Sequence, residues 1–495
     1  MSKIIIQNGN MCELDIPLKY AQKLYNEFAI RHPNAFYLRT RQRGMQNWDG
    51  KIHYITKTGQ FKIGLLPKVY DMCIEMGIKP KVVDMRQPLP KVSEVVTNIG
   101  KYKLRPEQEK AVKSVINNRV GDIPFQIGVL DLTVNFGKTL IMSSLYLSYK
   151  KQLKTLLITN DSDWLNQARE EFKQYLPGED ITFVQGKVLN WSNFTIGMVQ
   201  SISRNMRFYQ KELSQIDMVL IDEADQGGSK QYQNVITRLF NTRIRIGLSG
   251  TIYMSKLAKD KVKNMNLECF FGKVIAEFKL KDSIKKGYST KTIVKMVPGK
   301  PWYGNWESDC ISYKDIYDDS ITENNTAWTM AYNRLRWNIN QGRYPALVVC
   351  KHIAHCENLY KFFKKKLGDA YNIAYVHVNT PSKLRQQIMR DFREGKIDIL
   401  VSTTIIARGK NFPKLRYLLN AASMDSQEKS IQFLGRLVRT DKSKKKVYLD
   451  DLHYPGNYLD RHGKHRKQYY QRQELKVILL DKLWKKHPNH SLIKS

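Results

Sequence analysis

A chain of 495 residues is too long for one hydrophobic core, so we expect about two to four domains. Its hydrophobic content of 42% excludes an intrinsically disordered chain. Lysine and arginine total 82 against 46 aspartate and glutamate residues, a formal charge of +36 that favours a polyanionic partner, with nucleic acid the first candidate and an anionic membrane surface the second.

The membrane alternative finds no support in the hydrophobic pattern. No apolar run approaches the roughly 18 residues of a spanning helix, and the N-terminus Met1–Ile4 lacks the long apolar core of a signal peptide. The six cysteines are scattered without a Cys-x-x-Cys pair, so neither a zinc knuckle nor a disulfide framework is indicated. We expect a reducing, cytoplasmic location and no membrane partner.

Residues 1–95 predict a small α+β domain. Its expected strands are short and alternate with helices: strands at Ile4–Ile6, Cys12–Ile16 and Lys81–Met85, and helices opened by Pro17 and within Lys62–Met76. A stiff linker, Arg86–Pro90, marks its end.

The middle of this domain predicts a basic strand at Phe36–Arg43. Asp49-Gly50 is a strong hairpin signal, and Lys51–Lys57 is expected to return as the partner strand. Three arginines beside aromatic residues are candidate DNA contacts: Arg39, Arg41 and Arg43. The alternative is a solvated basic face, and Trp48 is expected in the core.

The strongest signal is a strand, a tight loop and a helix between residues 125 and 147. Gly137, Lys138 and Thr139 stand at the turn, where the lysine can reach the β- and γ-phosphates of ATP and the threonine hydroxyl can hold Mg²⁺. The backbone N–H groups at the helix start favour an anion. We therefore expect an ATP and magnesium site here.

The loop departs from the full pattern G-x-x-x-x-G-K-[ST], because Leu132 occupies the position of the first glycine. Asn135 stands where some phosphate-binding loops place a small residue, and it can adopt the left-handed conformation that a tight loop needs. With Phe136 it completes the predicted nucleotide-binding loop. The alternative is an ordinary strand-to-helix turn.

Gln108 and Arg105 precede a predicted helix, Lys110–Asn117, upstream of this loop. A glutamine in this place can contact the edge of adenine, and the arginine can stack or pair nearby. The same residues also fit a plain helix N-terminus with Pro106 in its first turn.

A second strong signal is an apolar strand, Met218–Ile221, that ends in the quartet Asp222-Glu223-Ala224-Asp225. Carboxylates at the carboxyl end of a parallel strand face the phosphate loop. Asp222 can hold Mg²⁺ through water, and Glu223 can orient and deprotonate the attacking water. The alternative is an acidic turn.

Alternating strands and helices predict two parallel sheets. The expected strands are 154–159, 195–198, 218–221, 244–248, 346–350, 373–376, 397–402 and 416–421, and the expected helices include 164–172, 354–363, 382–392 and 430–437. The second half has no phosphate loop, but Gln432, Arg436 and Arg439 form the pattern Q-x-x-G-R-x-x-R, with both arginines on one helical face. Placed across a cleft from Lys138, they can stabilise charge on the γ-phosphate. A basic surface helix is the alternative.

Residues 281–340 carry a weaker pattern with four tryptophans: Trp302, Trp306, Trp328 and Trp337. An inter-lobe linker with a core helix at Ala327–Ile339 is favoured over an aromatic wedge that separates strands. From Lys442 onward the chain is very basic. Because the whole chain carries +36, we favour DNA phosphate contacts over a solvated face for three residues of this region: Lys444, Lys445 and Arg461.

These motifs, in this order, resemble those of superfamily 2 helicases: Gly137–Thr139, the quartet 222–225, Ser249–Thr251, Ala407–Gly409 and Gln432–Arg439. The quartet matches DEAD-box RNA helicases, but their Ser-Ala-Thr and His-Arg-x-Gly-Arg boxes differ here. The chain more closely resembles the UvsW-type recombination and repair helicases of tailed phages. That resemblance spans nearly the whole chain and includes Asn47–Gly50 and Phe270–Val274.

The resemblance implies ATP-driven remodelling of branched DNA, namely branch migration, fork regression and annealing with limited duplex unwinding. It implies that Gln108 contacts adenine, that Gly409 contacts ribose or the γ-phosphate, and that Ser249–Thr251 couples hydrolysis to movement of the second lobe. It adds candidate strand contacts: Asn160, Gln200, Lys351, His352, Thr403 and Thr404. It also implies the cytoplasm of a phage-infected bacterium.

We predict an α/β fold of two RecA-like parallel-sheet lobes in tandem with a small N-terminal α+β accessory domain. The expected boundaries are 1–95 for the DNA-binding accessory domain, 96–280 for the ATP-binding lobe, 281–455 for the second lobe and 456–495 for a basic C-terminal helical tail. The expected activity is that of an ATP-dependent DNA helicase acting on branched or forked duplex and single strands, with a monomer as the working assumption. An RNA helicase or RNA-remodelling ATPase and a non-enzymatic basic DNA-binding scaffold stay open as alternatives.

Overall fold

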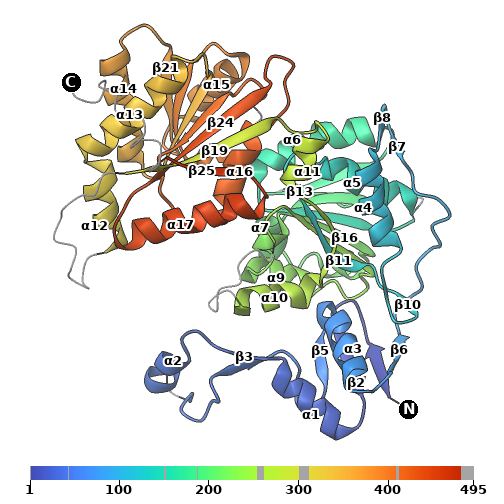
Figure 1. Cartoon of the computed structure of the whole chain (residues 1–495). Coiled ribbons are helices and arrows are strands. Elements are labelled where there is room, and N and C mark those ends of the chain that lie inside the picture. Colours follow the sequence, from blue (N-terminus) through green and yellow to red (C-terminus); the bar gives the residue numbers. More distant parts are fainter. Residues whose placement is uncertain are drawn as a thin grey trace. The chain divides into compact units, whose positions relative to one another are not determined.

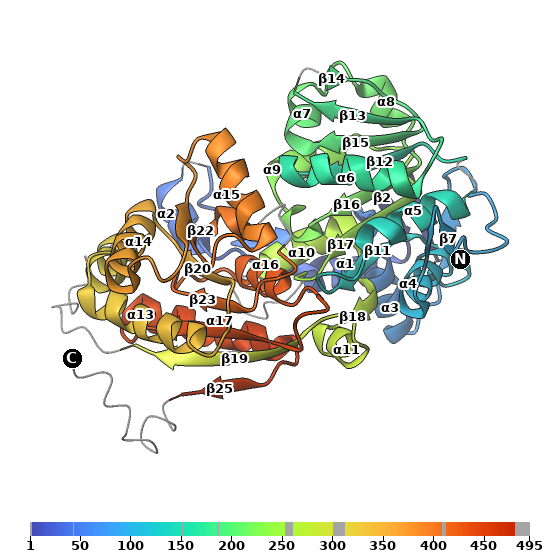
Figure 2. The same cartoon turned by 90° about the horizontal axis from the view of Figure 1, so that it is seen from above.

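The computed structural model describes residues 2–42, 44–149, 152–186, 188–252, 261–299, 312–407 and 412–480. The chain divides into two units, Met1–Phe278 and Lys279–Ser495, whose elements are labelled in Figures 1 and 2. Each unit contains one RecA-like α/β lobe, and the first also contains a small N-terminal α+β region. This architecture confirms the fold predicted from the sequence.

The N-terminal region is a four-stranded sheet of order β5-β2-β1-β6 with two helices. Its elements are β1 (Lys3–Ile6), β2 (Met11–Asp15), α1 (Leu18–Glu27), β5 (Gln60–Lys62), α3 (Leu66–Glu75) and β6 (Lys81–Asp84). Every second residue of β1 is buried, which directs Ile4 and Ile6 into the core. β2 runs antiparallel and β6 parallel to β1.

An arm, residues 29–53, leaves this sheet between α1 and β5 (Figure 1). It consists of the antiparallel pair β3 (Ala29–Arg31) and β4 (Lys51–His53) with α2 (Ala35–Arg41) between them. The strand predicted at Phe36–Arg43 is therefore wrong. β3 takes the edge of β4 that this segment would need, so the segment satisfies its backbone groups within a helix.

Trp48 also differs from its prediction. Its ring is half-buried in the arm, and its indole Nε1 donates a hydrogen bond to Lys51 O at 2.9 Å. It stands edge-on to the ring of His32, with centroids 5.8 Å apart. The tryptophan thus stabilises the turn before β4 and does not belong to the hydrophobic core.

Buried arginines attach the N-terminal region to the first lobe. Arg245 is fully buried and donates to Gly9 O at 2.6 Å, to Asn10 Oδ1 at 2.8 Å and to Phe270 O at 3.1 Å. Arg243 donates to the carbonyl oxygens of the 86–90 linker and pairs with Asp217 at 2.7 Å. The two parts also share one hydrophobic cluster, so the linker is held against the lobe.

The first lobe has an eight-stranded sheet of order β14-β13-β15-β12-β16-β17-β11-β18. Its strands are β11 (Ile127–Leu132), β12 (Thr155–Thr159), β13 (Ile181–Gln185), β14 (Val188–Leu189), β15 (Phe194–Met198), β16 (Met218–Asp222), β17 (Ile244–Ser249) and β18 (Val274–Phe278), all parallel except the short edge strand β14. Its helices are α4 (Pro106–Ile116), α5 (Lys138–Ser148), α6 (Ser162–Tyr175), α7 (Val199–Arg204), α8 (Gln210–Ser214), α9 (Lys230–Ile236) and α10 (Lys261–Phe271). Two small hairpins precede the sheet: β7 (Asn98–Ile99) with β8 (Tyr102–Lys103), and β9 (Arg119–Val120) with β10 (Ile123–Pro124). The central strands are buried at every residue, as expected where helices cover both faces of a parallel sheet.

The second lobe has a seven-stranded parallel sheet of order β21-β22-β20-β23-β24-β19-β25. Its strands are β19 (Lys291–Pro298), β20 (Ala346–Cys350), β21 (Ile373–Val376), β22 (Ile399–Thr403), β23 (Tyr417–Asn420), β24 (Lys446–His453) and β25 (Val477–Leu479). Its helices are α11 (Leu280–Lys285), α12 (Tyr313–Tyr317), α13 (Asn325–Ile339), α14 (Ile353–Leu367), α15 (Ser382–Glu394), α16 (Gln427–Leu437) and α17 (Asn457–Arg472).

Two segments of this lobe differ from their sequence-based expectation. β19 comes from the region expected to be an inter-lobe linker, yet it pairs with β24 along its whole length. β25 lies in the region expected to be a helical tail, yet it pairs with β19. The core helix expected at Ala327–Ile339 is present as α13.

Candidate active site and nucleic-acid contacts

The phosphate loop connects β11 to α5, and its backbone is left-handed at two positions. Asn135 has φ 65° and Gly137 has φ 86°. The left-handed backbone of Gly137 favours glycine, and a Cβ atom there would lie 2.4 Å from Gln108 Nε2 and displace that amide. α5 begins at Lys138, and its first backbone N–H groups therefore lie at the loop.

Gln108 and Arg105 hold this loop from the start of α4. Gln108 Nε2 and Arg105 Nη2 each donate to the carbonyl oxygen of Phe136 at 2.6 Å. Gln108 Oε1 in turn accepts from the Arg105 backbone N–H at 2.8 Å. The structure thus brings the predicted upstream pair to the predicted loop. The adenine contact of Gln108 stays a prediction.

Lys138 faces the acidic quartet at the end of β16. Its Nζ lies 3.6 Å from Asp222 Oδ1. Burial alone would lower the pKa of Lys138, but the surrounding carboxylates, first Glu223 and then Asp222, raise it above its ordinary value. Burial raises the pKa of Asp222 to about 6 in spite of the nearby ammonium group. Thr139, the other predicted magnesium ligand, is buried one residue beyond the lysine.

The quartet is tied to the next strand of the sheet. Glu223 has φ 53°, a backbone strain of about 1–3 kcal/mol for a non-glycine residue that is common at functional sites. Ser249 Oγ donates to Asp225 Oδ1 at 2.8 Å and accepts from the Thr251 N–H at 3.1 Å. Because β16 and β17 are neighbours, both motifs lie at one carboxyl edge. A shift in one can therefore move the other.

Two predicted strand contacts lie along the same edge. Asn160 follows β12, and Gln200 lies in the first turn of α7. Gln200 Nε2 donates to Asn160 O at 3.5 Å, and Asn160 Nδ2 donates to Gln226 Oε1 at 3.3 Å. The structure therefore connects these residues with the loop after the acidic quartet.

The carboxyl edge of the second sheet carries four further predicted contacts: Lys351 and His352 after β20, and Thr403 and Thr404 at the end of β22. The ammonium group of Lys351 lies 3.8 Å from the ring centroid of Tyr313. Burial and the nearby Lys429 lower the pKa of Lys351, and Lys429 Nζ donates to Thr404 Oγ1 at 3.0 Å. This edge is therefore basic and partly covered by an aromatic ring.

Arg436 lies in the last turn of α16, but Arg439 does not share its helical face. The helix ends at Leu437. Thr290 donates its backbone N–H to Val438 O at 2.8 Å and its hydroxyl to Arg439 O at 3.1 Å. These bonds lead the chain out of the helix, so the predicted i, i+3 relation of the two arginines is wrong.

Several other predicted residues lie in the second unit or outside the described residues. Gln432 lies on α16 one turn before Arg436. Trp328 packs against the core of the second lobe and donates to Ile321 O at 3.0 Å, and Trp337 is covered by three cationic groups, so neither is a free wedge. Four predicted residues lie outside the described residues: Arg43, Trp302, Trp306 and Gly409.

Lys444 is not a DNA contact. Its ammonium group is buried and donates to Leu415 O at 3.0 Å and to Leu437 O at 3.1 Å. Burial lowers its pKa to about 8. Lys445 and Arg461 are exposed, and the Arg461 guanidinium lies 5.2 Å from the ring centroid of Tyr458.

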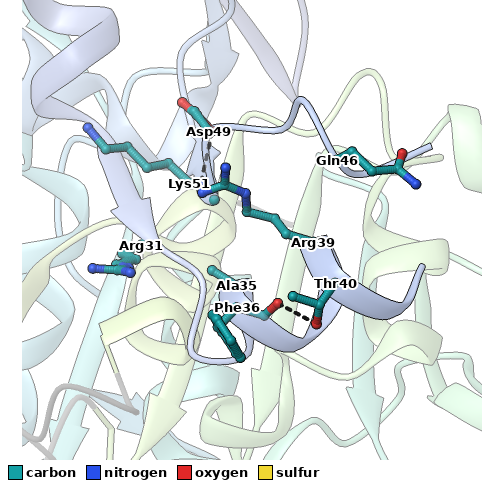
Figure 3. A pocket seen from close by; sticks show the side chains of 9 residues that line it. Arg31, Ala35, Phe36, Arg39, Thr40, Gln46, Asp49 and Lys51 are labelled. Carbon is teal, nitrogen blue, oxygen red and sulfur yellow. Dashed lines mark hydrogen bonds between the residues drawn. The ribbon is translucent and has the colours of Figure 1, made fainter. Parts of the chain in front are cut away.

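The arm forms a basic hollow of 470 Å³ (Figure 3). Arg31, Arg39 and Lys51 line it together with Asp49. Arg39 and Arg41 are exposed on α2. The aromatic residues of the same helix, Phe36 and Tyr37, are 80% and 56% exposed. The arm therefore combines cationic groups with accessible ring faces.

Sequence reasoning missed a polar cluster between α17 and the ends of β23 and β24. There Arg466 pairs with Asp451 at 2.8 Å, and His465 Nδ1 lies 3.0 Å from both carboxylate oxygens of Asp425. The basic run 461–467 suggested a surface for DNA. A signal was present in the spacing, because His462, His465, Arg466 and Tyr469 recur three or four residues apart and so share one helical face.

Two family models match the chain, one to each lobe. "Type III restriction enzyme, res subunit" matches residues 101–254, and "Helicase conserved C-terminal domain" matches residues 331–441. Together they cover more than half of the chain and both of its nucleotide-motif regions. The chain is a helicase of superfamily 2.

Several named relatives of the chain are also helicases, at low sequence identity. The helicase is 21% identical to the ATP-dependent DNA helicase uvsW of Enterobacteria phage T4 over 88% of this chain and 90% of that protein. It is 23% identical to the ATP-dependent RNA helicase CHR1 of Candida albicans over 46% of this chain and 33% of that protein. The matched region spans only 64% of a relative from the Sulfolobus islandicus filamentous virus and 51% of one from Saccharomyces cerevisiae, at 23% and 22% identity and over 71% and 70% of this chain.

The fold is also shared with a solved structure, the ATP-dependent Type ISP restriction-modification enzyme LlaBIII bound to DNA. The helicase superposes on it with a TM-score of 0.57 at 13% identity, over 86% of this chain and 35% of that one. Among the residues that the structure describes, none of the helices has the length and apolar composition needed to cross a membrane.

Proposed function

We propose that this helicase acts on DNA and uses ATP and Mg²⁺ to remodel branched or forked substrates, as in recombination, repair or replication. The observation that carries the ATP-dependent part of the proposal is the arrangement at one carboxyl edge of the first sheet. There Lys138 lies 3.6 Å from Asp222, and Ser249 bonds the same acidic quartet.

The chain's own groups fit a magnesium nucleotide. The N–H groups at the start of α5 and the Lys138 ammonium would hold the phosphates. In nucleotide sites Mg²⁺ takes one or two carboxylates together with substrate phosphates, and Asp222 and Thr139 are the donors offered here. Glu223 would position the attacking water and accept its proton. When bound, the metal ion neutralises charge on the phosphates.

Gln432, Arg436 and Arg439 keep their proposed role as residues that stabilise charge developing on the γ-phosphate. Only Arg436 and Gln432 lie on α16, so Arg439 would act from the chain segment that follows the helix.

The extent of the sequence similarity favours DNA over RNA as the substrate, and the arm offers a surface that fits nucleic acid of either kind. The match to a DNA helicase covers 88% of this chain, whereas the match to an RNA helicase covers 46%. The DNA helicase match is long enough to include the N-terminal region as well as both lobes. The arm adds a hollow with three cationic side chains, Arg31, Arg39 and Lys51, beside exposed aromatic rings. Phosphates would bind to the cationic side chains, and bases would stack on the aromatic rings.

The same proposal assigns strand phosphates to the polar edges of both sheets. Asn160 and Gln200 serve in the first lobe, and Lys351, His352, Thr403 and Thr404 in the second. Lys445 and Arg461 would add charge at the exposed part of the second lobe. Arg39 and Arg41 would act from the arm.

The test is ATP hydrolysis measured without nucleic acid and with single-stranded DNA, duplex DNA, a four-way junction or single-stranded RNA. We expect the junction to stimulate hydrolysis most and Glu223→Gln to abolish that stimulation. The matched control is Glu170→Gln, which changes an exposed carboxylate on α6 that pairs with Lys173 at 3.6 Å. Stimulation by RNA alone would replace the proposal with an RNA helicase, and hydrolysis under no condition would leave a DNA-binding scaffold.

A further inference from the structure

The turn that leads into the arginine-bearing helix α16 is strained. It runs from the end of β23 through residues 421–426. Ser423 has φ 43°, a left-handed backbone that costs a non-glycine residue about 1–3 kcal/mol and persists only where its surroundings hold it. Ser426 then caps α16, because its side chain accepts a hydrogen bond from the Lys429 N–H at 3.3 Å. The geometry of this turn thus decides where α16 begins.

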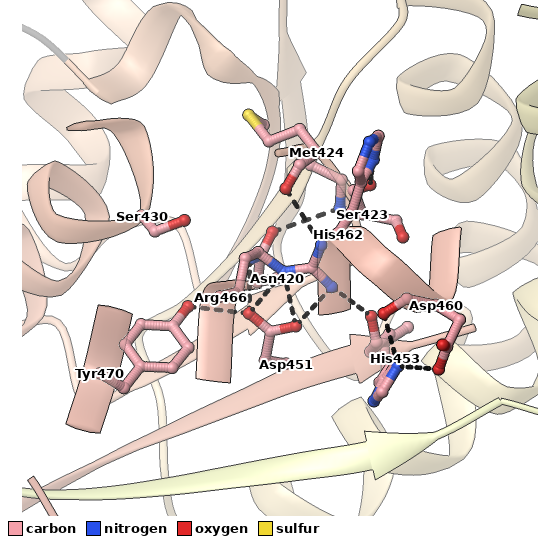
Figure 4. Close-up of polar contacts among 12 residues, drawn as sticks. Asn420, Ser423, Met424, Ser430, Asp451, His453, Asp460, His462, Arg466 and Tyr470 are labelled. Atoms are coloured by element: carbon pink, nitrogen blue, oxygen red, sulfur yellow. Dashed lines mark hydrogen bonds and ion pairs between the residues drawn. The ribbon is translucent and has the colours of Figure 1, made fainter. Parts of the chain in front are cut away.

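Three consecutive residues of the turn are bound by side chains of α17. His462 Nδ1 bonds Ser423 O at 3.3 Å, and Arg466 Nη1 bonds Met424 O at 3.0 Å (Figure 4). The next residue, Asp425, is bound through its carboxylate, by His465 Nδ1 at 3.0 Å and by Tyr469 at 3.1 Å. One face of α17 therefore holds residues 423–425 of the turn.

This face is itself anchored on the sheet. Arg466 donates three hydrogen bonds to the carboxylate of Asp451 on β24 and one to Leu452 O. The same carboxylate accepts from Asn420 and from Tyr470, each at 2.8 Å. Figure 4 shows these groups converging on Asp451. A fully bonded, buried network of this kind fixes the position of α17 tightly.

We propose that α17 is a positioning element for ATP hydrolysis: through His465, Arg466 and Tyr469 it holds the turn 423–425 and thereby sets the orientation of α16, which carries Gln432 and Arg436. The inference rests on the proposed role of α16 at the nucleotide. It concerns a segment beyond residue 441, where the helicase family model ends. α17 also packs directly on α16, which supports a mechanical link between them.

His465 is the best residue to test, because its imidazole bonds the Asp425 carboxylate and is partly exposed. His465→Ala removes the bond, and His465→Asn places an amide N–H near the position of Nδ1. The matched control is His453→Ala. His453 makes a bond of equal length, 3.0 Å, to Asp460 at the start of α17 and not to a residue of the turn.

The first measurement is hydrogen exchange of the backbone amides of residues 425–437, without nucleotide or nucleic acid. We expect His465→Ala to speed exchange there about tenfold, because a hydrogen bond to a charged group is lost, and we expect His465→Asn to restore it. His453→Ala should leave these amides unchanged. Unchanged exchange in His465→Ala, or an equal effect of His453→Ala, would overturn the positioning role.

The second measurement is nucleic-acid-stimulated ATP hydrolysis. We expect His465→Ala to lower kcat about tenfold to a hundredfold with little change in KM for ATP, since a misplaced catalytic group costs rate more than binding. His453→Ala should keep the wild-type kcat. A normal kcat in His465→Ala despite faster exchange would overturn the link to catalysis. Absence of hydrolysis in the wild type would instead reject the proposed function. The exchange result would then decide by itself whether α17 holds the turn 423–425.

Discussion

The two lobes each place an ion pair at the carboxyl end of their sheet, and the two pairs are built in opposite ways. In the first lobe, Lys138 and Asp222 are 3.6 Å apart and the lysine side chain is 18% exposed. In the second lobe, Arg466 and Asp451 are 2.8 Å apart and both side chains are completely buried. Asp451 accepts further hydrogen bonds from Asn420 and Tyr470.

The difference separates a pair that can bind a ligand, Lys138 and Asp222, from a pair that stabilises the fold, Arg466 and Asp451. Asp222 keeps a pKa of about 6, above the usual range of a carboxyl group, because burial outweighs the attraction of Lys138. Such a carboxylate gains from a further cation, which fits a magnesium nucleotide. Asp451 already has a full set of donors, and a saturated buried pair fixes structure. Charge alone therefore does not reveal which role a residue has.

The largest expected effect is the loss of stability when the Arg466–Asp451 pair is broken. Arg466→Ala leaves Asp451 buried without its counter-charge, so we expect the free energy of unfolding of the second unit to fall by about 3–5 kcal/mol. Urea unfolding followed by hydrogen exchange of residues 446–470 would measure it. Arg466→Met combined with Asp451→Leu removes both charges and should recover part of the loss. A loss below about 1 kcal/mol for the single change, the level of an exposed pair, would contradict the structural role.

Breaking the Lys138–Asp222 pair, the open pair, should lower activity strongly and stability little. Lys138→Ala is expected to lower kcat for ATP hydrolysis about 10²- to 10³-fold, because a cation aimed at the phosphates is lost. The thermal midpoint should change little, since Asp222 can take up a proton in place of its partner. Steady-state hydrolysis and thermal unfolding of the same sample would show this. Lys113→Ala removes an exposed helical pair with Glu109 and serves as the control.

Lys444 offers an intermediate case, because it is a buried cation that donates to the carbonyl oxygens of Leu415 and Leu437. Its pKa of about 8 lies below the ordinary value of 10.5, so between these values the unfolded chain binds more protons than the folded one. The free energy of unfolding should therefore rise with pH across this window, by about 3 kcal/mol in total for a shift of this size. Lys444→Met should remove that rise when both proteins are compared by urea unfolding from pH 7.5 to 10.5. Parallel pH profiles of the two proteins would argue against a buried ammonium group.

These cases show what the sequence could and could not predict. The strand-loop-helix around Lys138 and the strand that ends at Asp222 could be located from the sequence, because each has a short, local pattern at a strand end. The basic residues of 444–467 were misjudged because burial depends on a partner that lies far off in the sequence or on carbonyl groups without a sequence signature. Asp451 and Arg466 are fifteen residues apart and meet only when α17 packs on β24. The helix α2 was missed for a similar reason, since the edge of β4 was taken by β3.

The smallest expected effect concerns the loop beside the open pair. Asn135 is left-handed, with φ 65°, so Asn135→Ala should destabilise the loop by about 1–2 kcal/mol while Asn135→Gly should be neutral or slightly stabilising. If the strain is confined to the loop, Asn135→Ala should weaken nucleotide affinity roughly tenfold and leave the second unit unchanged. Nucleotide titration and hydrogen exchange would measure the two quantities. Equal affinity of the alanine and glycine variants would mean that the loop can reach its binding geometry without a strain-free left-handed residue at position 135. The acidic quartet would then be sufficient to position Lys138.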